Sequence, residues 1–228
     1  METKNALYIV ATPIGNDDDI TIRAINTLKS ADALICEEYR NGSRLLKKYD
    51  IPQKEIITLN EHDEDTQVEG ILIRLAQGQN LALVCDCGTP LFSDPGHRLV
   101  EMTVSAGFKI VPIPGVSSLT TIISVTPVKL EKYVFGGFLP RDPNDRVNEL
   151  KKLKAYHQPI ILMDTPYRLT TLLENVQAVF GKGQNMTLGC DLTMPSEKIF
   201  TGTCEEIIKK AKGLKAEFML VIHPLPRG

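Results

Sequence analysis

The sequence predicts an α/β protein with two α/β domains, the first built on a mostly parallel sheet and the second on a mixed sheet. In the first half, short apolar runs bounded by turn residues are typical of strands covered on both faces. They alternate with segments of helical periodicity, and this alternation produces βαβ units and a parallel sheet. The expected strands are Leu7–Val10, Ala33–Cys36, Leu81–Val84 and Ile110–Ile113.

The second domain is predicted from a change of character near Ser117. A helix of small residues is expected over 117–124, and a proline-marked connection follows at Pro127. Ile160–Met163 is expected to form a buried strand, and Leu169, Leu172, Leu173 and Val176 to form one face of a helix. Three shorter strands, over 185–191, 196–201 and 217–223, complete a mixed or antiparallel sheet.

A boundary near residues 114–117 divides the chain into an N-terminal domain, 1–115, and a C-terminal domain, 116–228. The 228 residues are 43% hydrophobic, which is enough to bury one large core or two small ones. No apolar run approaches the roughly 18 residues that span a bilayer, and the N-terminus shows no signal-peptide pattern. We therefore expect a cytoplasmic protein without a membrane partner.

The five cysteines are an odd number, which favours reduced thiols over a disulfide framework. Cys85 and Cys87 are separated by one residue, a spacing unlike the usual zinc-binding pair, and no second ligand pair follows. The sequence therefore predicts no metal site.

The net charge of −2 lacks the basic signature of a strong nucleic-acid binder, although two local clusters are basic. Charged residues on a helix usually form a solvated face, and contact with phosphates is the alternative interpretation. The first cluster is Arg40, Arg44, Lys47 and Lys48, and the second is Arg141, Arg146, Lys151, Lys152 and Lys154.

The stretch from Cys85 to Gly96 is the most informative, because a loop rich in glycine and proline here joins a strand to a helix. Asp94 and Pro95 are expected to be the N-cap and first residue of that helix, and Gly107 its end. Its apolar surface is expected from Leu99, Met102 and Val104. Ligands collect outside the carboxyl ends of parallel strands, so this loop predicts a ligand site, with an ordinary βα connection as the alternative.

Several turn clusters fall at strand ends, and together with their flanking residues they form an ordered set of motifs. In this order the set resembles the S-adenosylmethionine-dependent tetrapyrrole methylase superfamily over nearly the whole chain, and within it the branch that acts on small-subunit ribosomal RNA. The motifs are Tyr8–Asn16, Asp19–Arg23, Cys36–Arg40, Gly88–Gly96, Pro112–Ser117, Gly137–Pro140 and Thr165–Leu169.

The chain departs from the family pattern at several motifs. The family usually has Ser-Asp-Ala-Gly-Thr-Pro where this chain has Cys85–Pro90, and Glu-Ser-Pro-His-Arg where it has Asp164–Arg168. A Thr usually follows the Glu-Asp pair where this chain has Glu37-Glu38-Tyr39. Typical members also carry a C-terminal extension that is expected to be missing here, which leaves open a different substrate or a different grip on it.

The resemblance implies S-adenosylmethionine as the cofactor, bound in a cleft between the two domains. Gly88 permits close approach of backbone, Ser117 and Ser118 offer hydroxyl and N–H groups, and Met163 offers apolar surface for adenine. The cofactor contacts that the resemblance implies are Ile14, Cys87, Gly88, Thr89, Phe92, Ser117, Ser118, Met163, Asp164, Gly189 and Cys190.

The expected acceptor for the proton of a ribose hydroxyl is a carboxylate near the end of a strand. Glu37, Arg40 and Asp94 are the catalytic candidates, for substrate positioning or proton handling. Asp94 has the alternative interpretation of an N-cap, and Glu37 that of an ion pair with Arg40. His62 is a histidine in a plausible active-site loop.

The cofactor's sulfonium carries an activated methyl group, so the protein mainly has to align a nucleophile with it. The resemblance implies 2′-O-methylation of a cytidine in 16S ribosomal RNA, within the small ribosomal subunit, by a homodimer. One alternative is a tetrapyrrole or other small-molecule methylase. Another, of a different class, is a module that binds a nucleotide without catalysis.

Overall fold

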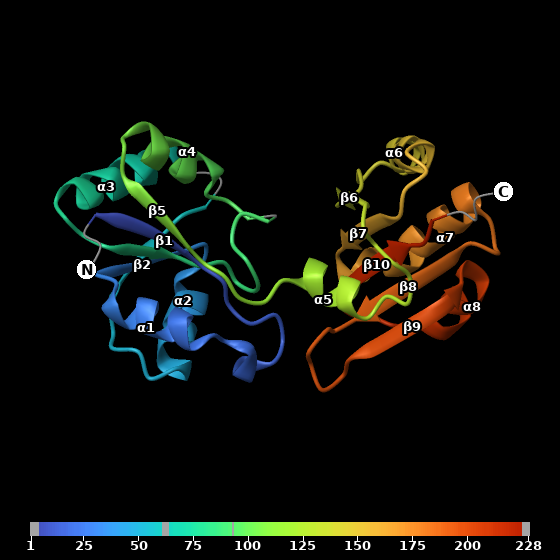
Figure 1. The fold of residues 1–228 in the computed structure, drawn as a ribbon, viewed down its shortest axis with the longest axis horizontal. Helices are drawn as coiled ribbons and strands as arrows, with labels where there is room; N and C mark the ends of the chain where they lie inside the picture. Colours follow the sequence, from blue (N-terminus) through green and yellow to red (C-terminus); the bar gives the residue numbers. More distant parts are fainter. Residues whose placement is uncertain (1–4, 61–63, 93, 225–228) are drawn as a thin grey trace. The chain divides into compact units, whose positions relative to one another are not determined.

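The computed structural model describes residues 5–60, 64–92 and 94–224. The chain divides into two compact units, residues 1–117 and 118–228 (Figure 1), which are described separately below. Within the described ranges, no helix has both the length and the hydrophobicity needed to cross a membrane.

Unit 1 contains a five-stranded sheet in the order β3-β2-β4-β1-β5, and its neighbouring strands pair in parallel. The predicted parallel sheet is therefore confirmed. The edge strand β3 was not predicted, because its four residues are exposed or only half-buried and carry a weak apolar pattern. The strands are β1 (Ala6–Val10), β2 (Ala33–Cys36), β3 (Glu55–Thr58), β4 (Leu81–Leu83) and β5 (Lys109–Ile113).

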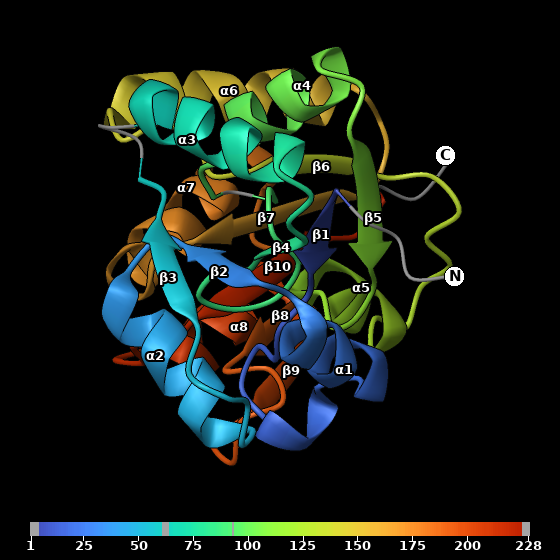
Figure 2. The same ribbon diagram turned by 90° about the vertical axis from the view of Figure 1, so that its left-hand side faces the viewer.

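Helices cover both faces of this sheet, as Figure 2 shows. Leu28 of α1 and Leu46 of α2 pack in the core on one face, and Ile71 of α3 and Leu99 of α4 pack in the core on the other. A short 3-10 helix, η1 (Asp17–Asp19), precedes α1. The helices are α1 (Ile22–Ser30), α2 (Tyr39–Lys48), α3 (Glu64–Ala76) and α4 (His97–Ser105).

The start of α4 differs from the prediction. The helix begins at His97, and its N-cap is Gly96 at φ 119°, so Asp94 and Pro95 lie in the loop before it. The chain makes a left-handed turn at Gly96, where a Cβ would lie 2.9 Å from Cδ2 of Leu91. Only a glycine fits this turn, and the helix cannot start before it.

The rest of α4 shows a second difference from the prediction. Val104 is 63% exposed, whereas Leu99 is fully buried together with the hydroxyl residue Thr103. The Thr103 hydroxyl donates to the Leu99 carbonyl at 2.7 Å, which satisfies its hydrogen bonding inside the core. Gly107 follows the helix end at φ 75°, which confirms the predicted C-terminal glycine.

Unit 2 contains a five-stranded sheet in the order β6-β7-β10-β8-β9. β6 and β7 are parallel, whereas β10 is antiparallel to both β7 and β8, and β8 is antiparallel to β9. The predicted mixed sheet is confirmed. The strands are β6 (Val134–Gly137), β7 (Ile160–Asp164), β8 (Asn185–Cys190), β9 (Lys198–Thr203) and β10 (Phe218–Ile222).

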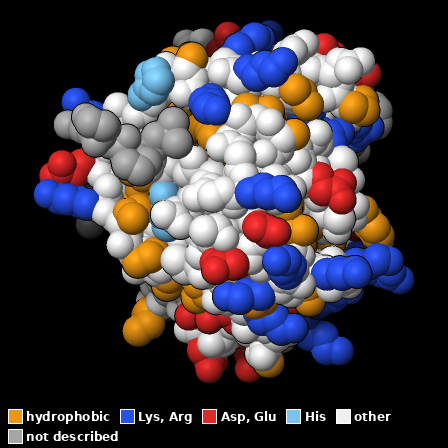
Figure 3. All heavy atoms as spheres, turned by 90° about the vertical axis from the view of Figure 1, so that its right-hand side faces the viewer, with side chains coloured by type: hydrophobic (Ala, Val, Ile, Leu, Met, Phe, Trp, Pro, Cys, Tyr) orange, Lys and Arg blue, Asp and Glu red, His pale blue; other side chains and the backbone are white. Residues whose placement is uncertain are grey.

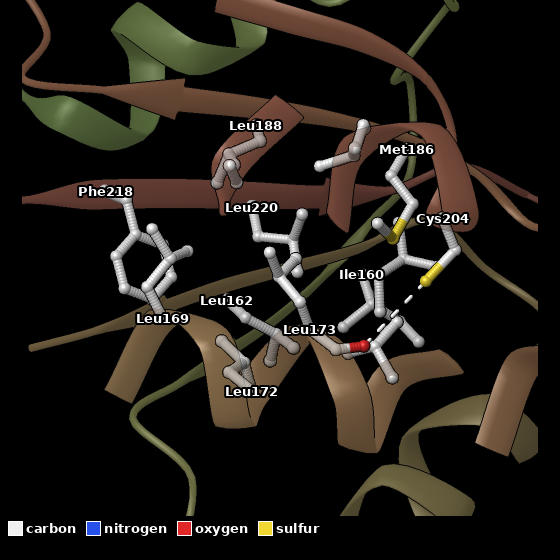
Figure 4. Packing of buried hydrophobic residues seen from close by; sticks show 14 of the residues in the cluster. Ile160, Leu162, Leu169, Leu172, Leu173, Met186, Leu188, Cys204, Phe218 and Leu220 are labelled. Carbon is white, nitrogen blue, oxygen red and sulfur yellow. Dashed lines mark hydrogen bonds between the residues drawn. The ribbon is translucent and has the colours of Figure 1, made fainter. Parts of the chain in front are cut away.

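Three helices of unit 2 contribute to one core, together with one face of the sheet. Figure 4 shows Leu169, Leu172 and Leu173 of α7 pointing toward Leu188 and Leu220 of the strands. The short helix α5 lies on the opposite face, where its Ile122 packs close to Gly189. The helices are α5 (Ser118–Ser124), α6 (Pro143–Ala155), α7 (Leu169–Phe180), which follows the 3-10 helix η2 (Pro166–Arg168), and α8 (Cys204–Ala211).

The strand β6 was not predicted, because it contains a pair of glycines, which are rare in strands. A Cβ on Gly136 would lie 2.7 Å from Cδ2 of Leu162, so the glycine lets neighbouring side chains pack against the backbone. The pairing of β6 with β7 shifts register between Phe135 and Gly137. Tertiary packing therefore decides this strand.

Candidate functional site

In unit 1, hydrogen bonds join three loops that follow β1, β4 and β5. The backbone N–H of Thr12 donates to the Gly88 carbonyl at 2.8 Å, and that of Gly88 donates to the Thr12 carbonyl at 3.0 Å. The Thr89 hydroxyl donates to the Val116 carbonyl at 3.1 Å. The loops therefore form one connected surface at the carboxyl edge of the parallel sheet.

Close backbone approach at this edge depends on Gly88. Its φ is +81°, a conformation that side chains disfavour, and a Cβ there would lie 3.2 Å from Cγ2 of Ile14. Ile14 is half-buried, whereas Cys87 and Thr89 are exposed. These four residues of the predicted cofactor set are thus neighbours, with apolar surface, backbone and a hydroxyl available to a ligand.

The strand order also favours a ligand here. β1 and β4 are neighbours in the sheet, but α1 and α4, the helices that follow them, pack on opposite faces. Such neighbouring strands create a crevice at their carboxyl ends, where open α/β sheets bind ligands. The predicted residues Phe92 and Ser117, both half-buried, lie in the loops after β4 and β5.

The thiol of Cys85 lies beneath the loop after β4. Its Sγ donates to the Cys87 carbonyl at 3.1 Å, and burial raises its pKa strongly. The negative charge of Asp94 raises that pKa further, so the Asp94 carboxylate lies near this thiol. Cys85 therefore stays protonated and supports the loop, while Asp94 is half-buried beside it.

The other catalytic candidates lie at the carboxyl end of β2. Glu37 directly follows this strand and Arg40 is the second residue of α2, and both are exposed. Burial raises the pKa of the neighbouring Cys36 thiol to about 11, with a smaller contribution from the charge of Asp86. The charge of Asp86, in the loop after β4, therefore acts on the Cys36 thiol at the end of β2. His62 and the loop residue Ser93 lie outside the described residues.

In unit 2, β10 brings together four predicted cofactor contacts that are distant in sequence. Met219 pairs with both Met163 and Gly189, and in the next row Phe218 pairs with both Asp164 and Cys190. These contacts occupy two adjacent rows across β7, β10 and β8.

The two rows present their side chains to opposite faces, because side chains alternate along a strand. Met163 and Gly189 lie on the face where α5 packs, and a Cβ on Gly189 would lie 2.7 Å from Cδ1 of Ile122. Cys190 lies in the core on the other face with Phe218. Its buried side chain is therefore shielded from a ligand. The predicted Ser118, half-buried, is the first residue of α5.

Asp164 is held by its own neighbours. Its side chain is 1% exposed, and its Oδ1 accepts from the Thr165 N–H at 2.8 Å and lies 3.2 Å from Nη1 of Arg168. Arg168 Nη2 donates to the carbonyls of Leu139 and Pro140 at 3.1 and 2.8 Å. The sequence assigns no separate role to Arg168, and its position within the motif 165–169 is the signal that could have identified it.

The two basic clusters differ in the structure. On α2, Arg40, Arg44, Lys47 and Lys48 are all exposed at helical spacing along one stripe, and Lys48 pairs with Asp17. On the side of unit 2 that Figure 3 shows, Lys and Arg side chains lie with Asp and Glu side chains among them, so this face is not uniformly basic.

The interpretation of Arg146 as a phosphate contact is wrong. It is 5% exposed, and its Nε and Nη2 donate to the carbonyls of Pro140 and Arg141 at 3.0 and 2.6 Å. Lys154 donates to the Val179 carbonyl at 2.7 Å, and Lys152 pairs with Glu149. Arg141 and Lys151 are exposed. The sequence could not separate these cases, because all five residues carry the same charge.

No group of three or more His, Cys, Asp or Glu side chains in the described ranges is placed to hold a metal ion. The five cysteines all lie in the described ranges and none forms a disulfide; Cys87 is exposed and the others are buried. Burial raises the pKa of Cys190 and Cys204 to about 11.

Several relatives of this chain carry the same name. Ribosomal RNA small subunit methyltransferase I of Halalkalibacterium halodurans is 35% identical over 224 residues, which cover 97% of this chain and 77% of the relative. The proteins of that name from Escherichia coli O157:H7 and Mesorhizobium japonicum are 34% and 38% identical. They cover 97% and 96% of this chain, which spans 78% and 75% of those relatives.

Solved structures share the fold. Cobalt precorrin-4 methyltransferase matches with a TM-score of 0.71 at 17% identity, over 96% of this chain and 95% of that one. Uroporphyrin-III-C-methyltransferase from Thermus thermophilus matches with a TM-score of 0.64 at 17% identity, over 96% and 94%. The family model for tetrapyrrole (corrin/porphyrin) methylases matches residues 6–208, and the chain belongs to this family.

Proposed function

We propose that the protein transfers a methyl group from S-adenosylmethionine to small-subunit ribosomal RNA, at the ribose 2′-hydroxyl of a cytidine. Relatives at 34–38% identity that carry the ribosomal RNA methyltransferase name support the RNA substrate. The observation that carries the proposal is the connected surface at the carboxyl edge of unit 1, where Thr12, Gly88 and Val116 join three loops.

The residues of both units fit the proposed cofactor. At Gly88 a Cβ would fill the space that a ligand needs, and Ile14 beside it offers apolar surface. Thr89 adds an exposed hydroxyl close to Val116. In unit 2, Met163 offers a polarisable thioether for adenine, and Gly189 in the same row makes room for Ile122 and Leu192. When bound, the cofactor supplies a methyl group already activated by the sulfonium.

Proton handling is proposed for the carboxylates near the carboxyl edge of unit 1. Glu37 is exposed directly after β2 and is our candidate acceptor for the proton of the ribose hydroxyl. Arg40, exposed in the first turn of α2, would position a phosphate of the RNA. Asp94 would keep the loop after β4 in place through its proximity to Cys85.

The proposed partner is the small ribosomal subunit, and the proposed location is the cytoplasm. The exposed basic stripe on α2 supplies phosphate contacts, which position an RNA strand without selecting its sequence. Single-stranded shape and the reach of one 2′-hydroxyl would then select the nucleotide.

A small-molecule methylase is the second candidate. The net charge of −2 favours it, because strong RNA binders are usually basic. The solved structures that share the fold are named as methyltransferases of tetrapyrrole precursors, but at 17% identity they support the fold alone.

Two measurements test the proposal. Calorimetry in a chelator should show binding of S-adenosylmethionine, because the proposed contacts are backbone, hydroxyl and apolar groups rather than metal ligands. Absence of binding would favour the non-catalytic nucleotide-binding module.

Mapping of ribose methylation on 16S ribosomal RNA in deleted and complemented cells tests the acceptor. We expect one cytidine methyl group to be lost on deletion and restored on complementation. An unchanged methylation map would reject the RNA assignment and favour the small-molecule methylase.

A further inference from the structure

A pocket of about 910 Å³ lies within unit 2, where the motifs 137–140 and 165–169 meet. Its volume falls within the range of small-ligand sites. We call it the arginine pocket, because three arginines line it. Its lining residues are Phe138, Leu139, Pro140, Arg141, Arg146, Asp164, Thr165, Tyr167, Arg168 and Thr171.

Two of the three arginines are immobilised. Arg146 on α6 and Arg168 in η2 both donate to the Pro140 carbonyl, at 3.0 and 2.8 Å. Arg146 also binds the Arg141 carbonyl, and Arg168 binds that of Leu139. They therefore fix the backbone that carries Arg141, whose own side chain is exposed. This built frame distinguishes the pocket from a hollow between mobile surface side chains.

Asp164, which lines the pocket, carries a buried acceptor. Asp164 Oδ1 is engaged by Thr165 and Arg168, but Oδ2 is buried and has no hydrogen-bond partner among the described residues. A buried carboxylate oxygen without a donor carries a desolvation cost, so a ligand N–H group placed there would be stabilised.

Two aromatic rings supply stacking surfaces. Tyr167 is 82% exposed and Phe138 is 47% exposed, so both rings offer area on which a base can stack. The ammonium of Lys215 lies 5.8 Å from the centre of the Tyr167 ring and adds positive charge near it. The combination of exposed rings, fixed positive charge and a carboxylate acceptor is the chemistry that binds an unstacked nucleotide.

We propose that the arginine pocket binds one nucleotide of single-stranded RNA. Its base stacks on Tyr167, an exocyclic amino group of the base donates to Asp164, and a neighbouring phosphate contacts Arg141. Carboxylates accept hydrogen bonds from the amino group of cytosine, whereas uracil carries no amino group. The inference rests on the proposed function, because it takes RNA as the substrate and names where a nucleotide is gripped.

The side-chain faces of β7 argue against S-adenosylmethionine as the occupant of this pocket. Met163 and Asp164 are consecutive in the strand, so their side chains point to opposite faces. Met163 shares the face of Gly189 and α5, where we place the cofactor contact, whereas Asp164 is engaged by Arg168. Asp164 therefore belongs to the RNA subsite, not to the cofactor contacts implied by the family resemblance.

The test measures binding of fluorescent hexacytidylate and hexauridylate to the full chain by anisotropy. We expect tighter binding of hexacytidylate, and about tenfold weaker binding of it in Tyr167→Ala, because stacking on an aromatic ring contributes on this scale. Arg141→Gln should weaken binding of both oligomers several-fold and reduce its salt dependence. Tyr156→Ala and Lys210→Gln are matched controls at exposed positions outside the pocket, and they should bind like wild type.

A further variant tests the contact with the amino group. Asp164→Asn should lose the preference for hexacytidylate, and thermal melting checks that it folds. If it does not fold, the wild-type comparison decides, and equal affinity for the two oligomers would overturn the assigned contact.

Two other outcomes would overturn the inference. Weaker S-adenosylmethionine binding in Tyr167→Ala, measured by calorimetry, would assign the pocket to the cofactor. Unchanged hexacytidylate binding in both Tyr167→Ala and Arg141→Gln would show that the pocket does not bind the oligomer. Pocket-dependent binding without methylation of the small subunit by wild type would reject the proposed function alone. Methylation by a wild type that binds neither oligomer would reject the pocket alone.

Discussion

At the residue scale, Gly88 shows how a single position connects backbone geometry to ligand binding. Its positive φ is needed for the paired hydrogen bonds with Thr12, and its missing side chain leaves Ile14 accessible. Gly107 also has a positive φ, of 75°, but a Cβ there would meet no atom within 4 Å. Substitutions at the two glycines therefore distinguish the effect of backbone strain from the effect of lost ligand contact.

We predict that Gly88→Ala and Gly107→Ala both lower the free energy of unfolding by about 1–2 kcal/mol, because a side chain disfavours positive φ. Only Gly88→Ala should also weaken binding of S-adenosylmethionine. Denaturant unfolding and calorimetry measure the two effects. Equal cofactor affinity in both variants would remove Gly88 from the proposed site.

Arg146 gives a second prediction at this scale. Arg146→Gln should lower the free energy of unfolding by about 2–3 kcal/mol, because a buried guanidinium that binds two carbonyls is lost. Arg141→Gln, at an exposed neighbouring position, should change it by less than about 0.5 kcal/mol. Thermal melting of both variants would show this. Equal stability would mean that Arg146 does not support the loop.

At the scale of elements, the face of the unit 2 sheet opposite the α6–α8 core contains a buried histidine. His223 follows β10, and its Nε2 lies 2.9 Å from the Thr187 hydroxyl of β8. The Gln184 side chain donates to the His223 carbonyl at 2.9 Å. Burial lowers the pKa of His223 below its ordinary value of 6.5, because the folded protein disfavours the charged form of the ring.

This histidine should make the stability of the protein depend on pH. The unfolded chain binds a proton near pH 6.5 and the folded chain only at lower pH, so the free energy of unfolding falls as pH drops below about 6.5. The contribution is fully present above that pH. In His223→Gln the loss of stability between pH 7.5 and 5 should be smaller, as measured by urea unfolding. An identical loss in both proteins would contradict this.

The helix α2 carries the prediction for RNA binding. Arg44 and Lys47 lie on its exposed basic stripe and are not among the proposed cofactor contacts. Arg44→Gln with Lys47→Gln should weaken binding to the small ribosomal subunit and reduce the salt dependence of that binding by about two charges. S-adenosylmethionine affinity should stay unchanged. Lys209→Gln with Lys210→Gln on α8 is the control with the same charge change, and equal weakening there would show a nonspecific effect of charge.

At the scale of the whole molecule, the two units each contribute a separate set of proposed cofactor contacts. In unit 1 the set lies on loops after parallel strands, and in unit 2 Met163 and Gly189 lie in one row across antiparallel strands. Different architectures thus supply the two sets, which explains why no repeated motif in the sequence marks them.

We predict that the full chain is a homodimer, as its family resemblance implies. Light scattering at micromolar concentration should give twice the mass of one chain. Exposed apolar residues of unit 1, such as Ile73 and Val104, are candidates for the interface, at 58% and 63% exposure. Ile73→Lys should then shift the equilibrium toward monomer, with Tyr156→Lys as an exposed control in unit 2. A wild type that scatters as a monomer would contradict this prediction.

The sequence by itself determined the alternation of strands and helices in unit 1, because buried parallel strands are short apolar runs and helices repeat every 3.6 residues. It also showed turn clusters at strand ends, among them 12–16, 87–90 and 114–118, and the carboxyl ends of parallel strands share an edge. The start of α4 could not be predicted from the local pattern. It depends on the left-handed turn at Gly96, which packs closely against Leu91.

Only the tertiary structure decided which of these residues work together. β10 lies between β7 and β8, so Met163 and Gly189 share a row although they are distant in sequence. The burial of Arg146 and the arginine pocket arise where β6 pairs with β7 and α6 covers them. Pairing and burial are long-range properties that local periodicity does not encode. The sequence therefore contains the motifs 137–140 and 165–169 without showing that they lie together.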